Sequence, residues 1–345
     1  MIQKGVHMKR LLNTLYVTTH DTRLSVSNNG VIAENPETGE KVRVTGTAID
    51  SIVCFGNTSV TTPLIGYCGE NGISLTFLSE YGRFLGRVNG PVSGSVLLRQ
   101  AQYRQDKKRA EEGFVKPLLA GERKNSREVL MRAARDKTDA NITDSIALIE
   151  NCLKRIEDFH GTEALMGLEG IAARAYFDAL PFIISSDEPE MSFEDRNRRP
   201  PKDRVNALLS YIYTLCAGDA QSALESVGLD PQCGYLHALR PGKPALALDL
   251  MEELRAMLCD RFVLSLINLR QIGKDSFEYR DDAFRLTAGA RRTVLDAWQK
   301  RKREEIYHSV FKERVEIGML PYAQAQLLAR FVRGDEPAYK AYTWR

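Results

Sequence analysis

The stretch SVLLR (95–99) divides the sequence into two parts with different patterns. Before it, short runs rich in β-branched and aromatic residues alternate with turn signals such as Asn28-Asn29-Gly30. After it, apolar residues recur with the helical period of about 3.6. The sequence therefore predicts an α+β fold, with a polar extension over 1–7, a small β-sheet domain over 8–98 and a larger all-α domain over 99–345.

The β part is expected to pair its strands mainly in antiparallel fashion, and Thr62-Pro63 is expected to open a short helix between them. The expected strands lie at 15–19, 23–27, 41–46, 51–56, 72–79 and 83–88. The expected helices lie at 97–113, 126–136, 141–158, 162–179, 203–217, 220–226, 246–270, 287–306 and 321–332. Connecting loops are expected over 185–201 and 228–244.

The composition is that of an ordinary globular protein of 345 residues. A net charge of +3 indicates no particular partner for the chain as a whole. The six cysteines are scattered without a C-x-x-C pair, which argues against a structural zinc site and fits the reducing cytoplasm. The absence of a long apolar run predicts no membrane span, and Met8 is an alternative start to Met1.

The stretch LMGLEGIAARAYF (165–177) places a carboxylate where a core residue is expected. In a helix, Glu169 stacks with apolar residues on one face, and Gly167 and Gly170 flank it. Such local conflicts tend to lie at functional sites. A carboxylate in this position is either the partner of a buried arginine or a metal ligand, and the pattern alone does not decide between them. The glycines would let another backbone or DNA approach closely.

A second group of polar residues follows in the chain. His237 lies in the Gly/Pro-bounded loop CGYLHALRPGKP (233–244), and the next helix carries Asp249 and Glu252. One imidazole with several carboxylates favours Mg²⁺ or Mn²⁺ over zinc, if these residues converge with Glu169. Individually, His237 could anchor its loop and Asp249 could be a first-turn charge. No P-loop, dinucleotide or nucleophile-elbow motif is present, so metal-assisted phosphate chemistry is the favoured enzyme class.

Two segments concentrate positive charge. RNRRPPKDR (196–204) and the segment over 291–303 are either solvated surface or contacts for a nucleic-acid backbone. The candidate DNA contacts are Arg196, Arg198, Arg199, Lys202, Arg301 and Arg303.

Three blocks, LEGIAARAYF (168–177), NRRPPKDRVNALLSYIYTL (197–215) and GYLHALRPGKPALALDLMEELR (234–255), resemble the CRISPR-associated adaptation endonuclease/integrase family in order and spacing. Overall similarity points to type I-C systems. The resemblance implies metal ligation by Glu169, His237 and Glu252, with Asp249 as a further catalytic position. It also implies homodimers formed through the β domain, and a partner in the small second Cas protein.

The implied activity is the insertion of captured double-stranded DNA at the leader–repeat junction of a CRISPR array, by 3′-hydroxyl attack on a phosphodiester. The same chemistry with water gives endonuclease activity. The alternative is a non-catalytic DNA-binding or architectural subunit with the same fold.

Overall fold

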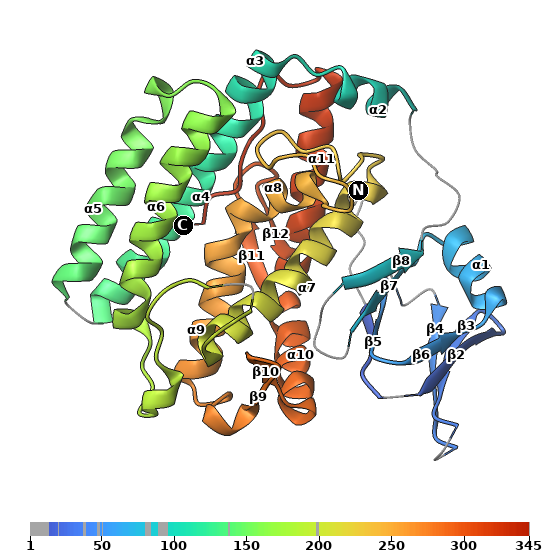
Figure 1. Cartoon of the computed structure of the whole chain (residues 1–345). Coiled ribbons are helices and arrows are strands. Elements are labelled where there is room, and N and C mark those ends of the chain that lie inside the picture. The colour runs from blue at the N-terminus through green and yellow to red at the C-terminus, as the bar shows by residue number, and fades with distance from the viewer. Residues whose placement is uncertain are drawn as a thin grey trace, which may run out of the picture. The chain divides into compact units, whose positions relative to one another are not determined.

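The computed structural model describes residues 14–19, 21–36, 39–46, 49, 51–79, 84–88, 96–136, 139–197 and 200–344. The chain forms two compact units that divide between Ser93 and Gly94. The first unit contains strands and one helix, and the second is mostly helical (Figure 1). The predicted α+β class is confirmed. The predicted extension over 1–7 lies outside the described residues.

The N-terminal unit contains two four-stranded sheets. The first has the order β1 (Thr14–Val17), β5 (Ser51–Phe55), β7 (Ser74–Leu78), β8 (Phe84–Val88), and the second has the order β4 (Lys41–Thr45), β3 (Gly30–Glu34), β2 (Thr22–Ser27), β6 (Thr58–Val60). Helix α1 (Thr62–Glu70) begins at the expected Thr62-Pro63. Buried side chains from both sheets and α1, including Leu24, Ile52, Leu64 and Leu75, form one core.

The prediction of mainly antiparallel pairing is wrong. Three of the six pairings between described strands of this unit are parallel: β1–β5, β5–β7 and β2–β6. Parallel neighbours need a crossover connection, and α1 supplies the one that leads into β7. Strand β3 was not among the predicted strands. It pairs with β2 through a tight turn in which Asn28 and Asn29 have positive φ values, as this type of hairpin turn requires.

The C-terminal unit is built on long helices. They are α2 (Val96–Tyr103), α3 (Lys107–Ala110), α4 (Lys116–Asp136), α5 (Ala140–Lys154), α6 (Thr162–Ile183), α7 (Arg204–Ser226), α8 (Ala245–Leu254), α9 (Arg261–Asn268), α10 (Ala288–Lys302) and α11 (Leu320–Arg333). Two π-helical turns, Glu111–Val115 and Arg255–Asp260, join α3 to α4 and α8 to α9. Helix α4 packs against α5, α6 and α8 (Figure 1).

Several helix boundaries differ from the prediction. Asp106 caps α3, so the helix predicted over 97–113 is broken into α2 and α3. Helix α4 includes 116–125, which carries Pro117 and Gly121 and was not predicted as helical. The helix predicted over 220–226 continues α7 through Gly218 without a break.

The unit predicted as all-α also contains two β-hairpins, β9 (Phe277–Arg280) with β10 (Ala283–Leu286) and β11 (Glu305–His308) with β12 (Glu313–Glu316). The first hairpin turns at Asp281 and Asp282, which both have positive φ. Among the described residues, no helix combines the length and apolar character that crossing a bilayer requires.

Candidate metal centre

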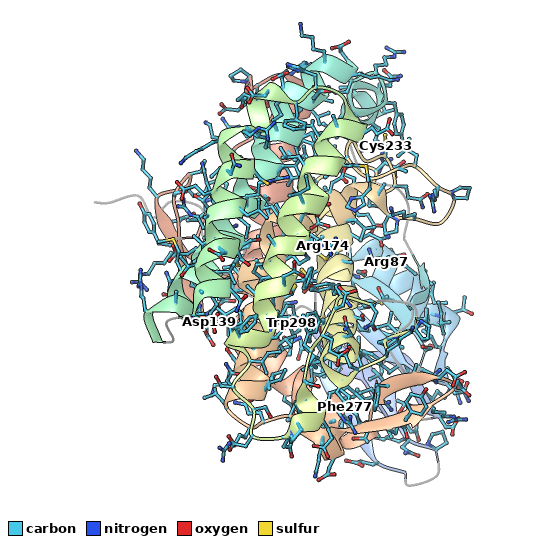
Figure 2. All side chains as sticks on the ribbon, turned by 60° about the vertical axis from the view of Figure 1, so that its left-hand side comes forward. Arg87, Asp139, Arg174, Cys233, Phe277 and Trp298 are labelled. Carbon is cyan, nitrogen blue, oxygen red and sulfur yellow. The ribbon has the colours of Figure 1, made fainter. Side chains whose placement is uncertain are left out.

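Glu169 lies in the middle of α6, beside the buried residues Leu165, Leu168 and Ala172. Its side chain is 24% exposed. It borders a cavity of about 790 Å³ whose lining is mixed in charge and includes Arg174, Arg196, Asp178, Glu194 and Asp195. Helices α5 and α6 lie side by side in Figure 2, with Arg174 on the outer surface of α6. Among the described residues, a Cβ atom at Gly167 or Gly170 would meet no atom within 4 Å beyond its chain neighbours and the nearby backbone of α6, so the space beside these glycines is open.

His237 is held in place by Asp249 of α8. The Asp249 carboxylate accepts hydrogen bonds from the backbone N–H groups of Tyr235 (2.7 Å), Leu236 (3.1 Å) and His237 (2.9 Å). Its Oδ1 also lies 2.7 Å from Nδ1 of His237. The loop closes this tightly because residue 234 is glycine: a Cβ there would lie 2.8 Å from Asp249 Oδ2. Asp249 therefore fixes the imidazole and leaves Nε2 for another partner.

Nε2 of His237 faces Glu252, at 3.8 Å from Oε1. Asp249 and Glu252 are three residues apart in α8 and lie on adjoining faces of the helix. Asp249 contacts Nδ1 of His237, and Glu252 lies on the side of Nε2. The second oxygen of Glu252, Oε2, lies 2.5 Å from Nη1 of the buried Arg255. Glu252 thus lies near His237, and its ligand oxygen is also within 4.8 Å of that of Glu169, while Asp249 holds the histidine. Metal binding by these residues stays a prediction.

Two functional candidates were not predicted from the sequence. Glu122 of α4 is buried, and its ligand oxygen lies within 4.8 Å of those of Glu169 and Glu252. Arg255 donates a hydrogen bond to Glu122 (3.1 Å) and lies 3.8 Å from Glu169. Glu169 therefore has an arginine neighbour as well as a ligand-like position, and both interpretations of its sequence pattern find support in the geometry. Glu122 lies in a charged stretch, GERKNSRE (121–128), which is typical of a solvated helix surface.

The electrostatics of the site favour a cation. Burial, together with the nearby carboxylates of Glu169 and Glu252, raises the pKa of Glu122 to about 8 against the opposing effect of Arg255. Burial and Glu252 also raise the pKa of Glu169. The buried oxygen Glu122 Oε2 accepts no hydrogen bond from the described part of the chain, and Glu252 Oε2 is held by the ion pair with Arg255. Crowded buried carboxylates next to a partly exposed imidazole suit a hard divalent cation.

The predicted DNA contacts differ in their surroundings. The Arg196 guanidinium donates to Asn206 Oδ1 and to the carbonyl of Asn197, which ties it to the start of α7. Lys202 and Arg303 are exposed, whereas Arg301 forms an ion pair with Glu304. Arg198 and Arg199 lie outside the described residues. DNA contact by these six residues stays a prediction.

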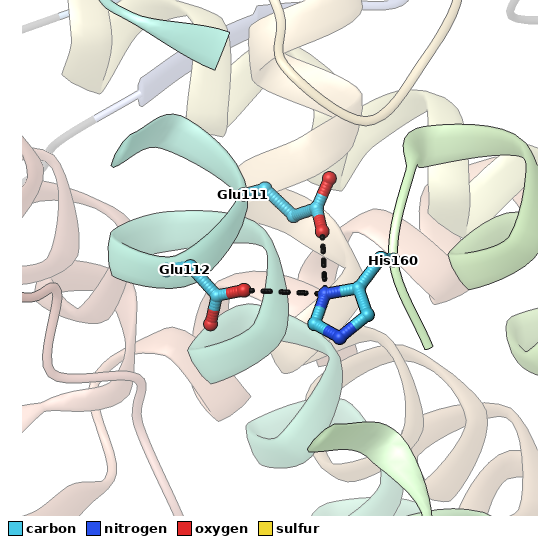
Figure 3. Close-up of side chains that lie close together, drawn as sticks. All are labelled: Glu111, Glu112 and His160. Atoms are coloured by element: carbon cyan, nitrogen blue, oxygen red, sulfur yellow. Dashed lines mark ion pairs between the residues drawn. The ribbon is translucent and has the colours of Figure 1, made fainter. Parts of the chain in front are cut away.

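A second group of possible ligands lies elsewhere in the helical unit. Glu111, Glu112 and His160 approach one another, with His160 Nδ1 3.6 Å from each carboxylate (Figure 3). The buried Lys116 already supplies a cation here, since its Nζ lies 2.8 Å from Oε1 of Glu112. His160 is 70% exposed. The ammonium group of Lys116 therefore already contacts Oε1 of Glu112, the oxygen that a metal ion at this group would need.

The fold and the centre define a class of protein: a β-sheet unit followed by a helical unit that carries a carboxylate–histidine centre. In fold, the chain is similar to a solved CAS1 protein from Thermotoga maritima (TM-score 0.79, 22% identity, covering 93% of this chain and 97% of that one). It is also similar to a casposase bound to integration product (TM-score 0.83, 21% identity, covering 96% and 94%).

Sequence comparison gives the family. The family model described as CRISPR associated protein Cas1 matches residues 15–300. A protein from Rhodospirillum rubrum named CRISPR-associated endonuclease Cas1 2 is 45% identical over 347 residues, covering 98% of this chain and 100% of the relative. One from Chlorobaculum tepidum, CRISPR-associated endonuclease Cas1 1, is 43% identical over 344 residues, with the same coverage. The chain belongs to the CRISPR-associated Cas1 family. The type I-C assignment stays a prediction.

Proposed function

We propose that the chain is a divalent-metal-dependent DNA endonuclease and integrase of CRISPR adaptation. It inserts short duplex DNA into a CRISPR array by attack of a 3′-hydroxyl on a phosphodiester. The observation that carries this proposal is that Glu252 lies near both His237 Nε2 and Glu169, and that Glu169 borders a cavity. The endonuclease names of the relatives, and the likeness in fold to a casposase bound to integration product, support it.

Glu169, His237 and Glu252 would hold the ion, which is Mg²⁺ or Mn²⁺. When bound, it supplies a Lewis acid that polarises a phosphoryl oxygen and stabilises the charge that develops there. Asp249 keeps His237 in the orientation that presents Nε2 to the site. The cavity beside Gly170 gives the reacting phosphate access to Glu169.

The proposed partners are double-stranded DNA, a second copy of the chain and the small Cas2 protein. The chain is similar in fold to part of a solved Cas6-RT-Cas1–Cas2 complex (TM-score 0.79, 22% identity, covering 99% of this chain and 37% of that one), which supports Cas2 as a partner. We assign dimerisation to the β-sheet unit and DNA backbone contact to the basic segments over 196–204 and 291–303.

Glu169→Ala and His237→Ala test the proposal in assays of Mn²⁺-dependent DNA cleavage and strand joining. Each variant should lose activity at least about 100-fold, because the ion contributes several kcal/mol to the reaction. Glu163→Ala, on the exposed first turn of α6, is the matched control and should keep activity. Full activity in both site variants would contradict the assignment. DNA binding without cleavage in the unmutated protein would favour the architectural alternative.

A further inference from the structure

A buried arginine stands among the carboxylates of the candidate centre. Arg255 is 6% exposed, and its Nη1 lies 2.5 Å from Oε2 of Glu252. Its Nη2 lies 3.1 Å from Oε1 of Glu122 and 3.8 Å from Oε1 of Glu169. These three carboxylates come from α8, α4 and α6. One guanidinium, which is always protonated, therefore lies against acidic side chains from three helices.

Arg255 contacts two of the carboxylates that the proposed function gives to the metal ion, Glu169 and Glu252. At Glu252 the arginine holds Oε2 while Oε1 faces His237, so the guanidinium and the ion would share carboxyl groups rather than single oxygens. Two cations on the same carboxyl groups in a poorly solvated site repel each other strongly. Binding of the ion must therefore weaken the contacts of Arg255 with Glu169 and Glu252.

Glu122 differs from the other two carboxylates in burial and in its contact with Arg255. It is 3% exposed, against 24% for Glu169, and among the described residues it forms no ion pair with His237, whereas Glu252 does. Nη2 of Arg255 is closer to Glu122 than to Glu169, and the contact with Glu122 is a hydrogen bond. Glu122 can therefore keep its hydrogen bond with the Arg255 guanidinium when Glu169 binds the metal ion.

We propose that Arg255 is an internal counter-cation that competes with the metal ion for Glu169 and Glu252, and that Glu122 is the anchor that retains its guanidinium when the ion binds. Both are positioning residues, and the inference rests on the proposed function. In the ion-free protein, Arg255 compensates buried carboxylates that would otherwise repel one another across three helices. The consequence is a lower affinity for the ion than the carboxylates alone would give.

The test is calorimetric titration of the full-length chain with Mn²⁺, without DNA. Arg255→Met removes the competing charge and should bind Mn²⁺ about tenfold more tightly, because one positive charge no longer opposes the ion. Its melting temperature in a chelator should fall. In Glu122→Gln, Arg255 loses its anchor and stays on Glu169 and Glu252. This variant should therefore bind Mn²⁺ about tenfold more weakly than the unmutated chain. The double variant should return toward the unmutated value, and Glu163→Gln is the control for loss of a remote charge.

The opposite sign overturns the proposal: weaker binding in Arg255→Met would mean that the arginine organises the ligands rather than competing for them. Unchanged Mn²⁺ binding in Glu122→Gln would show that Glu122 is not the anchor of Arg255. If Arg255→Met is unfolded in chelator, folding restored by Mn²⁺ supports the proposal, and unfolding in both conditions overturns it. Failure of the proposed function would give a different result. In that case, neither the unmutated chain nor any variant would bind Mn²⁺ in a way that is lost when Glu169 is changed to Ala.

Discussion

At the scale of single residues, Asp249 and Glu252 of α8 differ in what their carboxylates contact. The sequence pattern alone does not separate them, because three residues of helix place both on adjoining faces, and metal binding by Glu169, His237 and Glu252, which the family resemblance implies, stays a prediction. The hydrogen bonds decide: the Asp249 carboxylate is occupied by three backbone N–H groups and by Nδ1 of His237. Glu122 and Arg255 could not be paired from sequence, since their contact joins residues 133 apart.

Asp249→Asn should weaken Mn²⁺ binding about 10–100-fold, because the amide offers one acceptor where the carboxylate offers two, and the imidazole loses its fixed orientation. The measurement is titration calorimetry beside Glu252→Ala. Residual binding in Asp249→Asn with none in Glu252→Ala is the expected pattern. Equal and complete loss in both variants would make Asp249 a direct ligand.

At the scale of elements, the helices that carry the centre are braced by the end of the chain. Asn125 of α4 is fully buried and donates to the carbonyls of Glu253 (2.6 Å) and Tyr342 (3.0 Å), while it accepts from the N–H of Trp344 (2.7 Å). The guanidinium groups of Arg132 and Arg261 both lie over the Trp344 ring. The segment after α11 therefore joins α4, α8 and α9, and it lies beside α4 in Figure 1.

This contact also explains why the first half of α4 was not predicted as a helix. A Cβ at Gly121 would lie 2.7 Å from Cβ of Ala341, so the glycine that weakens the local helical signal is required by a tertiary contact. Local pattern cannot show a requirement that comes from a segment more than 200 residues away in the chain.

Asn125→Ala should lower the free energy of unfolding by about 2–4 kcal/mol, because two buried carbonyls and one N–H lose their partner. Urea denaturation followed by tryptophan fluorescence measures it, since Trp298 and Trp344 both lie in the helical unit. Asn151→Ala on the exposed face of α5 is the matched control. A loss below about 0.5 kcal/mol, the range of ordinary surface changes, would show that the bracing contributes little.

The π-helical turn after α8 ends at a buried carboxylate, Asp260, which accepts a hydrogen bond from the hydroxyl of Tyr213. Burial raises the pKa of Asp260 to about 6. Between its ordinary value near 3.8 and this value, the folded state holds a proton that the unfolded state has lost. The contribution of Asp260 to stability is therefore fully present below about pH 4 and decreases as the pH rises toward 6.

Asp260→Asn should remove this dependence. The unfolding free energy of the unmutated chain minus that of the variant should fall between about pH 4 and 6, by at most about 1.4 kcal/mol per pH unit, and then level off. Urea denaturation at a series of pH values measures the difference. A difference that is constant across this range, or that rises with pH, would contradict the raised pKa.

At the scale of the whole molecule, the change of pattern near 95–99 was enough to predict a β part followed by a helical part, because the periods of strands and helices differ. Strand direction was not accessible, since a parallel pair and an antiparallel pair share the same alternation. The two hairpins of the helical unit are short, and a strand of four residues such as β11 carries too few side chains for its period to be distinguished from the end of α10.

The central claim is that one divalent ion binds between α6, the loop before α8 and α8 itself. Anomalous scattering from a crystal soaked in Mn²⁺ tests it most directly. We expect one strong peak about 2.0–2.3 Å from a carboxylate oxygen of Glu169, from Nε2 of His237 and from a carboxylate oxygen of Glu252. A peak at Glu111, Glu112 and His160 instead, or no peak at His237, would contradict the account.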